Sequence, residues 1–144
     1  MEDDTIKLLR ECNAGIKMGV SSLDDVIEHV QSENLRNLLA QSKETHTKLG
    51  NITHGYLRDY HDNGKEPAAM AKMMSKIKSN INMNEDNADH KAADLITDGC
   101  NMGVKSLYKY LNQYPAAEEK VKKLAKDVAD AEETLVMDLR TFLY

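Results

Sequence analysis

Acidic side chains and one histidine recur at matching positions in two distant parts of the chain. His46 precedes Glu132 by 86 residues, Glu44 precedes Asp130 by the same interval, and Glu133 lies one helical turn beyond Asp130. Carboxylates and neutral imidazoles are common ligands of divalent metal ions. Together these five residues could supply four carboxylates and one imidazole. That set suits a single ion, iron or another divalent metal, but is too small for a bridged pair.

A competing interpretation keeps these side chains out of the core. The apolar spacing of this stretch places an inward seam on seven residues: Leu35, Leu38, Ser42, Thr45, Leu49, Ile52 and Tyr56. If Thr45 and its counterpart Ala131 point inward, His46 and Glu132 lie at the flank and the other acidic residues lie in water. His46 would then share a solvated helix face with His54. This simpler interpretation is the one that we favour.

The segments that must position these residues form an internal sequence repeat. Residues 12–17 are CNAGIK and residues 100–105 are CNMGVK, and the segments that follow match at a separation of 86. A helical hairpin cannot bury its apolar stripe alone, whereas two packed copies can. The sequence therefore predicts an all-α four-helix bundle made of two duplicated hairpins. The length suits a single domain over residues 1–144.

The repeated motif predicts close packing between the first and third helices. Its members are Cys12, Asn13, Gly15, Gly19, Gly99, Cys100, Asn101 and Gly103. Glycine inside a helix costs about 1 kcal/mol relative to alanine, which favours a site where another backbone approaches closely. The asparagines could form hydrogen bonds across that crossing, and the cysteines would act as small apolar residues. A functional cysteine pair is the alternative, but no nearby group is expected to lower a thiol pKa.

Apolar spacing and capping residues predict where the helices begin and end. The first runs from about residue 4 to 30, and Ser32 caps the second, which ends at the turn residues 62–64. The third spans about residues 84–112, and Pro115 suits the first turn of the fourth. Some twenty residues separate the second helix from the third. They predict a short amphipathic crossover helix with an apolar face made of Met70, Met73, Met74, Ile77 and Ile81.

Composition and charge exclude several classes of function. The chain is 41% hydrophobic and 30% charged with a net charge of −5, so it has no general attraction for nucleic acid or anionic lipid. No apolar run approaches the roughly 20 residues of a membrane span. The acidic N-terminus does not resemble a secretion signal, and two cysteines do not make a disulfide framework. We therefore expect a cytoplasmic protein without a nucleic-acid or membrane partner.

A short signature suggests a family. Residues 9–15 carry Leu-x-x-Cys-x-x-Gly, and residues 96–103 carry a looser copy. The chain thus resembles the ferritin-like superfamily, and more narrowly the small bacterial bundles of unknown function related to rubrerythrin, in their clostridial version. The resemblance implies a di-iron site with Glu-x-x-His pairs. The chain departs from that pattern, because residues 43–46 are KETH and residues 130–133 are DAEE.

Taken together, these patterns favour a non-enzymatic bundle that acts by association with itself or with another cellular component. The packing pattern is intact, whereas the metal-ligand pattern is incomplete. We expect a homodimer, because the apolar stripes look wider than one four-helix core needs. The alternatives are a metal-binding or redox protein with an atypical site, and a spore-coat or stress-related structural protein.

Overall fold

Four long helices make up the described part of the chain. The structure is a computed structural model, and it describes residues 2–62 and 87–144. The elements are α1 (Glu2–Ile27), α2 (Glu33–Asp59), α4 (Ala88–Gln113), α5 (Glu119–Leu139) and the short 3₁₀ helix η2 (Arg140–Phe142). No strand occurs in these residues, so the prediction of an all-α protein with four helices is confirmed. The predicted crossover helix, over residues 67–82, lies outside the described residues.

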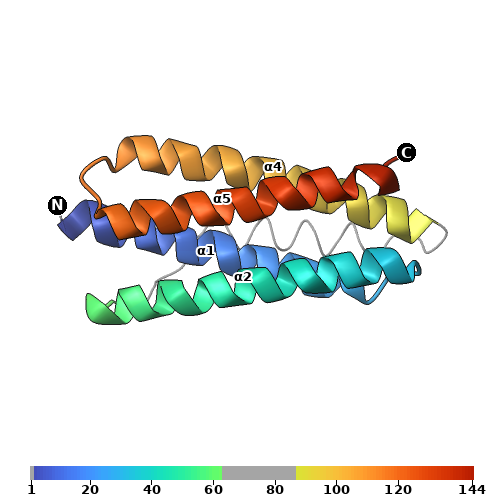
Figure 1. Cartoon of the computed structure of the whole chain (residues 1–144), viewed down its shortest axis with the longest axis horizontal. Coiled ribbons are helices and arrows are strands. Elements are labelled where there is room, and N and C mark those ends of the chain that lie inside the picture. Colours follow the sequence, from blue (N-terminus) through green and yellow to red (C-terminus); the bar gives the residue numbers. More distant parts are fainter. Residues whose placement is uncertain (1, 63–86) are drawn as a thin grey trace.

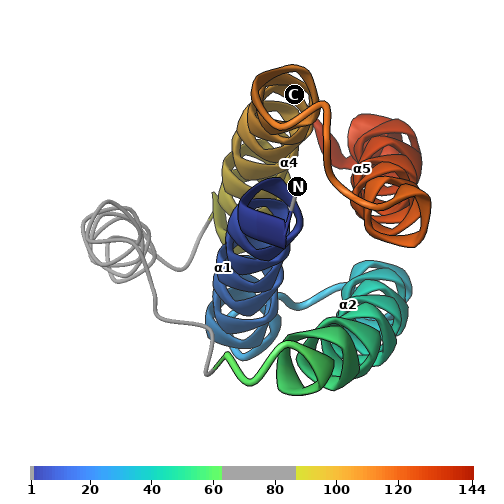
Figure 2. The same cartoon turned by 90° about the vertical axis from the view of Figure 1, so that its left-hand side faces the viewer.

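The four helices lie side by side along one long axis (Figure 1). α1 packs against α2, α4 packs against α5, and α1 also contacts α4. Viewed along the axis, α1 and α4 lie on one side and α2 and α5 on the other (Figure 2). α2 ends and α4 begins at opposite ends of the bundle, so these two helices run in the same direction. The predicted contact between the first and third helices is confirmed.

The predicted helix ends agree only in part with the observed ones. Ser32 caps α2 as predicted, because its side chain accepts a hydrogen bond from the backbone N–H of Leu35 at 3.2 Å. α1 ends at Ile27, three residues earlier than predicted. Pro115 does not lie in the first turn of the fourth helix, since α5 begins at Glu119 and a turn precedes it.

Contacts with α1 explain why the chain around Pro115 is not helical. The Asp4 carboxylate accepts a hydrogen bond from the backbone N–H of Ala116 at 3.0 Å. The Thr5 hydroxyl accepts one from the backbone N–H of Glu118 at 2.9 Å. These tertiary bonds pair two backbone N–H groups of the segment just before α5 with side chains of α1.

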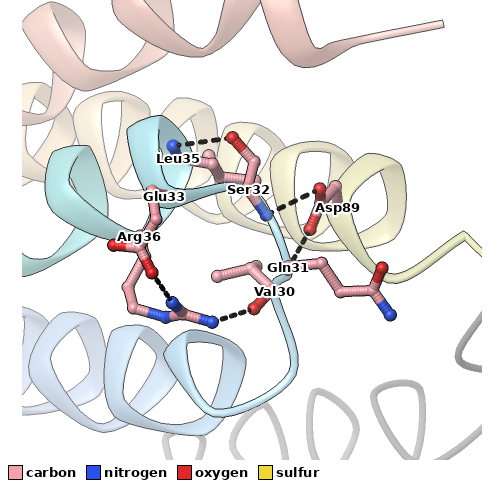
Figure 3. Close-up of polar contacts among 7 residues, drawn as sticks. All are labelled: Val30, Gln31, Ser32, Glu33, Leu35, Arg36 and Asp89. Carbon is pink, nitrogen blue, oxygen red and sulfur yellow. Dashed lines mark hydrogen bonds and ion pairs between the residues drawn. The ribbon is translucent and has the colours of Figure 1, made fainter.

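A similar arrangement holds the α1–α2 connection at the other end of the bundle (Figure 3). Asp89, in the first turn of α4, accepts hydrogen bonds from the backbone N–H groups of Gln31 at 2.7 Å and Ser32 at 3.1 Å. Arg36 donates to the backbone carbonyl of Val30 at 2.5 Å. Each hairpin therefore anchors the connection of the other, which fixes their axial register.

Two apolar clusters form the core, one toward each end of the bundle. The first gathers residues such as Leu8, Leu57 and Val121, and the second gathers residues such as Leu23 and Leu135. Along every helix the two clusters are separated by a short stretch near its middle. In α2 and α5 that stretch carries buried polar side chains, and it contains the candidate site.

The inward seam of α2 differs from the predicted one. Its buried residues are Leu35, Leu39, His46, Gly50, Thr53 and Leu57. Thr45 is exposed and His46 is buried, so the favoured interpretation, which placed His46 on a solvated face, is wrong. The apolar face of α2 is wide, because Leu38 and Leu49 pack half-buried at the edges of the clusters. The centre of such a face cannot be located from its apolar residues alone.

Candidate functional site

His46 and Glu132 face each other in the polar layer between the two apolar clusters. His46 of α2 is 1% exposed and Glu132 of α5 is 6% exposed. Nε2 of His46 lies 3.8 Å from Oε1 of Glu132, a distance that allows charge attraction but is too long for a hydrogen bond. One ionisable side chain from each hairpin thus reaches the interior, and the two meet there.

A hydrogen bond fixes the orientation of the His46 ring. Nδ1 lies 2.8 Å from the backbone carbonyl oxygen of Ser42. Because a carbonyl oxygen can only accept, Nδ1 must carry the proton. In the neutral ring, Nε2 is therefore an acceptor, and it faces a carboxylate that also only accepts when ionised. A proton, or a ligand that donates hydrogen bonds, is needed to join the two groups.

The surroundings shift the pKa of both groups in the same direction. Burial raises the pKa of Glu132 above its ordinary value of 4.5, and the lowering effect of His46 is smaller. Burial lowers the pKa of His46, but the Glu132 carboxylate and the Ser42 carbonyl together raise it more. The pKa of His46 is therefore higher than its ordinary value of 6.5. The folded protein retains protons that the unfolded chain releases.

These shifts predict how stability changes with pH. His46 contributes fully below its unfolded pKa of 6.5, and its contribution is lost as pH rises through the higher folded pKa. Glu132 acts in the same direction, since a raised carboxyl pKa makes the folded state less stable once pH exceeds 4.5. Between about pH 5 and about pH 8, wild-type protein should lose stability relative to a Glu132→Gln variant. Urea unfolding followed by circular dichroism measures this, and a difference that stays constant or moves in wild-type's favour would contradict it.

Two glycines make room for the pair. A Cβ atom at Gly19 would lie 3.0 Å from Cδ2 of His46, and one at Gly103 would lie 2.4 Å from Oε2 of Glu132. Each hairpin therefore uses a glycine of its first helix to admit the polar side chain of its second helix. At these two positions the predicted reason for glycine, close approach of another backbone, is wrong, because side chains fill the space.

A cavity of about 40 Å³ adjoins the pair, between α1 and α4. Gly15, Gly99 and Cys100 line it together with apolar side chains of α1, α4 and α5. No described atom lies within 4 Å of a Cβ atom built at Gly15 or Gly99. Glu132 also lines the cavity, and its Oε2 is buried without a hydrogen-bond partner among the described residues.

The two cysteines occupy separate apolar clusters, Cys12 in the first and Cys100 in the second. Burial raises the pKa of Cys12 to about 12, and burial together with Glu132 raises the pKa of Cys100. Both thiols are free, protonated and packed as apolar residues. Asn13 is buried whereas Asn101 is exposed, and the predicted hydrogen bond between them is not among those of the described residues.

Of the five predicted metal ligands, the structure brings together only His46 and Glu132. Glu44, Asp130 and Glu133 are exposed on α2 and α5. Successive residues of a helix point about 100° apart, and here Glu44, Asp130 and Glu133 fall on the solvent side of their helices. Within residues 2–62 and 87–144, no group of three or more histidine, cysteine or acidic side chains is placed to hold a metal ion.

Sequence reasoning missed the burial of the pair, the Ser42 carbonyl and the cavity. The available signal was the glycine content of the first and third helices. Gly19 and Gly103 each lie in the layer of a polar residue on the partner helix. A polar side chain opposite a glycine in a helical hairpin is one arrangement that admits a bulky group into a narrow core.

Comparisons with known proteins support the fold but no family. No family model matches the chain, and no curated protein matches it. A solved structure described as a DUF305 fragment from Deinococcus radiodurans aligns with a TM-score of 0.79 and 12% identity, covering 96% of this chain and 93% of that chain. At this identity the likeness shows a shared fold alone. Within the described residues, no helix has the length and apolar character needed to cross a membrane.

This structural neighbour overturns the predicted resemblance to rubrerythrin. The DUF305 fragment belongs to a different helical family, and neither the family models nor the curated proteins connect the chain to a ferritin-like one. The prediction of a ferritin-like, clostridial-type member is therefore wrong. The Leu-x-x-Cys-x-x-Gly signature describes apolar packing along a helix, which unrelated bundles share.

Proposed function

We propose that the protein is a non-enzymatic helical bundle that acts by association, with a second copy of itself as the partner. The observation that supports this proposal is that the reactive side chains are buried while several apolar ones are exposed. The thiols and the His46–Glu132 pair are buried, and both thiols have raised pKa values. Large apolar side chains instead stand at the surface of three helices: Ile52 is 44%, Met102 48% and Met137 57% exposed.

The face between α2 and α5 is the proposed contact surface. A groove of about 320 Å³ runs between these helices, and Leu38, Ala131 and Leu135 supply its apolar part. Ser42 and Thr45 supply polar groups without charge, and Asp130 and Asp138 supply two carboxylates. α2 and α5 belong to different hairpins, so the groove follows the line where the hairpins meet. A second copy that covers it would shield half-buried apolar side chains at that line.

Oligomeric state tests this proposal. Light scattering at micromolar concentration should report a particle of twice the 16.2 kDa mass of the chain. Ala131→Glu would add a negative charge to a groove that already carries Asp130 and Asp138, and should weaken the dimer about tenfold or more, since burying an unpaired charge is unfavourable. Asn101→Glu, an exposed change on a helix that does not line the groove, is the control. A 16.2 kDa particle at every concentration would refute the dimer.

We also propose that the two hairpins are copies of each other. In three dimensions α1 and α4 match at a separation of 84 residues, about one helical turn less than the 88 residues that separate CNAGIK from CNMGVK. Thr5 accepts a hydrogen bond from the backbone N–H of Glu118, and Asp89 accepts one from the backbone N–H of Ser32. The two acceptors are 84 residues apart and the two donors are 86 residues apart. The buried residues of α4 each lie 84 positions after a buried residue of α1: Ala92, Ala93, Ile96, Cys100 and Leu107. Related contacts at both ends of the bundle support a duplication.

The two alternatives have less support. A metal-binding or redox role would rest on His46 and Glu132 alone, because the other three predicted ligands are exposed. Elemental analysis of untagged protein, with a His46→Ala control, tests it. A spore-coat or stress-related role has no residue of this chain as its evidence.

A further inference from the structure

We propose that the cavity between α1 and α4 binds a small primary ammonium ion, of about the size of methylammonium, against Glu132 and His46. This binding site differs from the proposed dimer surface between α2 and α5, with which it shares one lining residue, Leu135. Three observations support it: two glycines that meet no described atom, a buried carboxylate oxygen without a partner among the described residues, and two acceptor groups that face each other.

The first observation concerns Gly15 and Gly99. Gly19 and Gly103 are explained by His46 and Glu132, which a Cβ atom would strike. At Gly15 and Gly99 a Cβ atom would meet no described atom within 4 Å, so alanine would fit and would favour the helix. Since both glycines line the cavity, their effect is to keep that space open.

The second observation is the state of the Glu132 carboxylate. Its side chain is 8% exposed, and Oε2 has no hydrogen-bond partner among the described residues. A buried carboxylate oxygen without a donor is strongly unfavourable in an apolar interior. Because Glu132 lines the cavity, a ligand placed there could reach its carboxylate group.

The third observation defines the chemistry of the ligand. At a pH where His46 is neutral and Glu132 is ionised, Nε2 and the carboxylate are both acceptors, 3.8 Å apart, so a ligand that satisfies both must be a donor. The carboxylate favours a positive charge, and a primary ammonium group offers three N–H donors. A metal ion fits less well, because these two side chains are too few to complete its coordination.

The cavity limits the size of the ligand and favours an alkyl group on it. A water molecule needs roughly 10–15 Å³ on this measure. About 40 Å³ therefore suits up to about three non-hydrogen atoms. Leu23, Ile96 and Leu135 form apolar walls, against which a methyl group could pack. This size fits ammonium or methylammonium.

Thermal unfolding of the full chain tests the proposal. Methylammonium chloride should raise the melting temperature in a saturable manner, by about 2–4 °C beyond the effect of sodium chloride at the same concentration. Tetramethylammonium chloride, which is larger and has no N–H donor, should match sodium chloride. In NMR spectra, nuclear Overhauser effects should connect the ligand methyl group to the methyl groups of Leu23 and Ile96.

Variants locate the site. Glu132→Gln should lose the specific rise in melting temperature, and Gly99→Ala should lose it by filling the cavity. Gly55→Ala is the matched control, because Gly55 also has open space around it but lies on α2 and does not line the cavity. A wild-type response equal to that in sodium chloride, or a full response in both Glu132→Gln and Gly99→Ala, would overturn the proposal. If either variant fails to fold, the nuclear Overhauser effects in wild-type protein decide.

Discussion

Replacing His46 with leucine is expected to lower the free energy of unfolding by about 3–5 kcal/mol at neutral pH. The change leaves Glu132 buried beside an apolar group, and an uncompensated buried charge is among the most destabilising defects a core can have. Leucine nearly fills the volume of the imidazole, so a new cavity would account for little of the loss. Urea unfolding followed by circular dichroism gives the free energy.

His54→Leu is the matched control for this change. His54 is on the same helix but exposed, so its replacement should change stability by no more than about 0.5 kcal/mol. Equal effects of the two leucine substitutions would show that His46 is not in a special environment.

Gly103→Ala should destabilise the protein by about 1–3 kcal/mol, although alanine is the better helix former by about 1 kcal/mol. The new Cβ atom would lie 2.4 Å from Oε2 and 3.0 Å from the carboxyl carbon of Glu132. Either the Glu132 side chain must leave its position opposite His46, or α4 and α5 must move apart. Thermal unfolding of the variant measures the loss.

Gly15→Ala provides the opposite case on the equivalent helix of the other hairpin. No described atom lies within 4 Å of a Cβ atom at this position, so the variant should gain about 0.5–1 kcal/mol from helix propensity. The two alanine substitutions therefore have effects of opposite sign. A loss of stability in both, of similar size, would mean that the contact with Glu132 does not determine the cost at Gly103.

Local signals were enough to predict the helices. Apolar residues at helical spacing gave the number of long helices, and Ser32 gave the start of α2, because an N-cap acts on residues close to it in sequence. The contact between α1 and α4 was also predicted correctly from the repeated glycines, although close approach of a backbone explains none of them. Pro115 misled the prediction for α5, since backbone N–H groups of that segment donate hydrogen bonds to Asp4 and Thr5, more than 100 residues away, rather than joining the helix.

The site could not be predicted in the same way. Whether His46 or Thr45 points inward depends on how α2 rotates against its neighbours, and the wide apolar face of α2 leaves that rotation open. The space for His46 comes from Gly19, on another helix, so it has no signal near His46 in the sequence. The family resemblance failed for a related reason, because its signature describes packing that many helical bundles need.

The most direct test of the account is a double-mutant cycle on His46 and Glu132. The account holds that these two side chains form one coupled unit in the core, so removing both should be less harmful than the sum of the single losses. A variant with both His46→Leu and Glu132→Leu should be more stable than His46→Leu alone, with a coupling energy on the order of 1–3 kcal/mol. Losses that add to within about 0.5 kcal/mol would show that the two groups act independently, and would contradict the account.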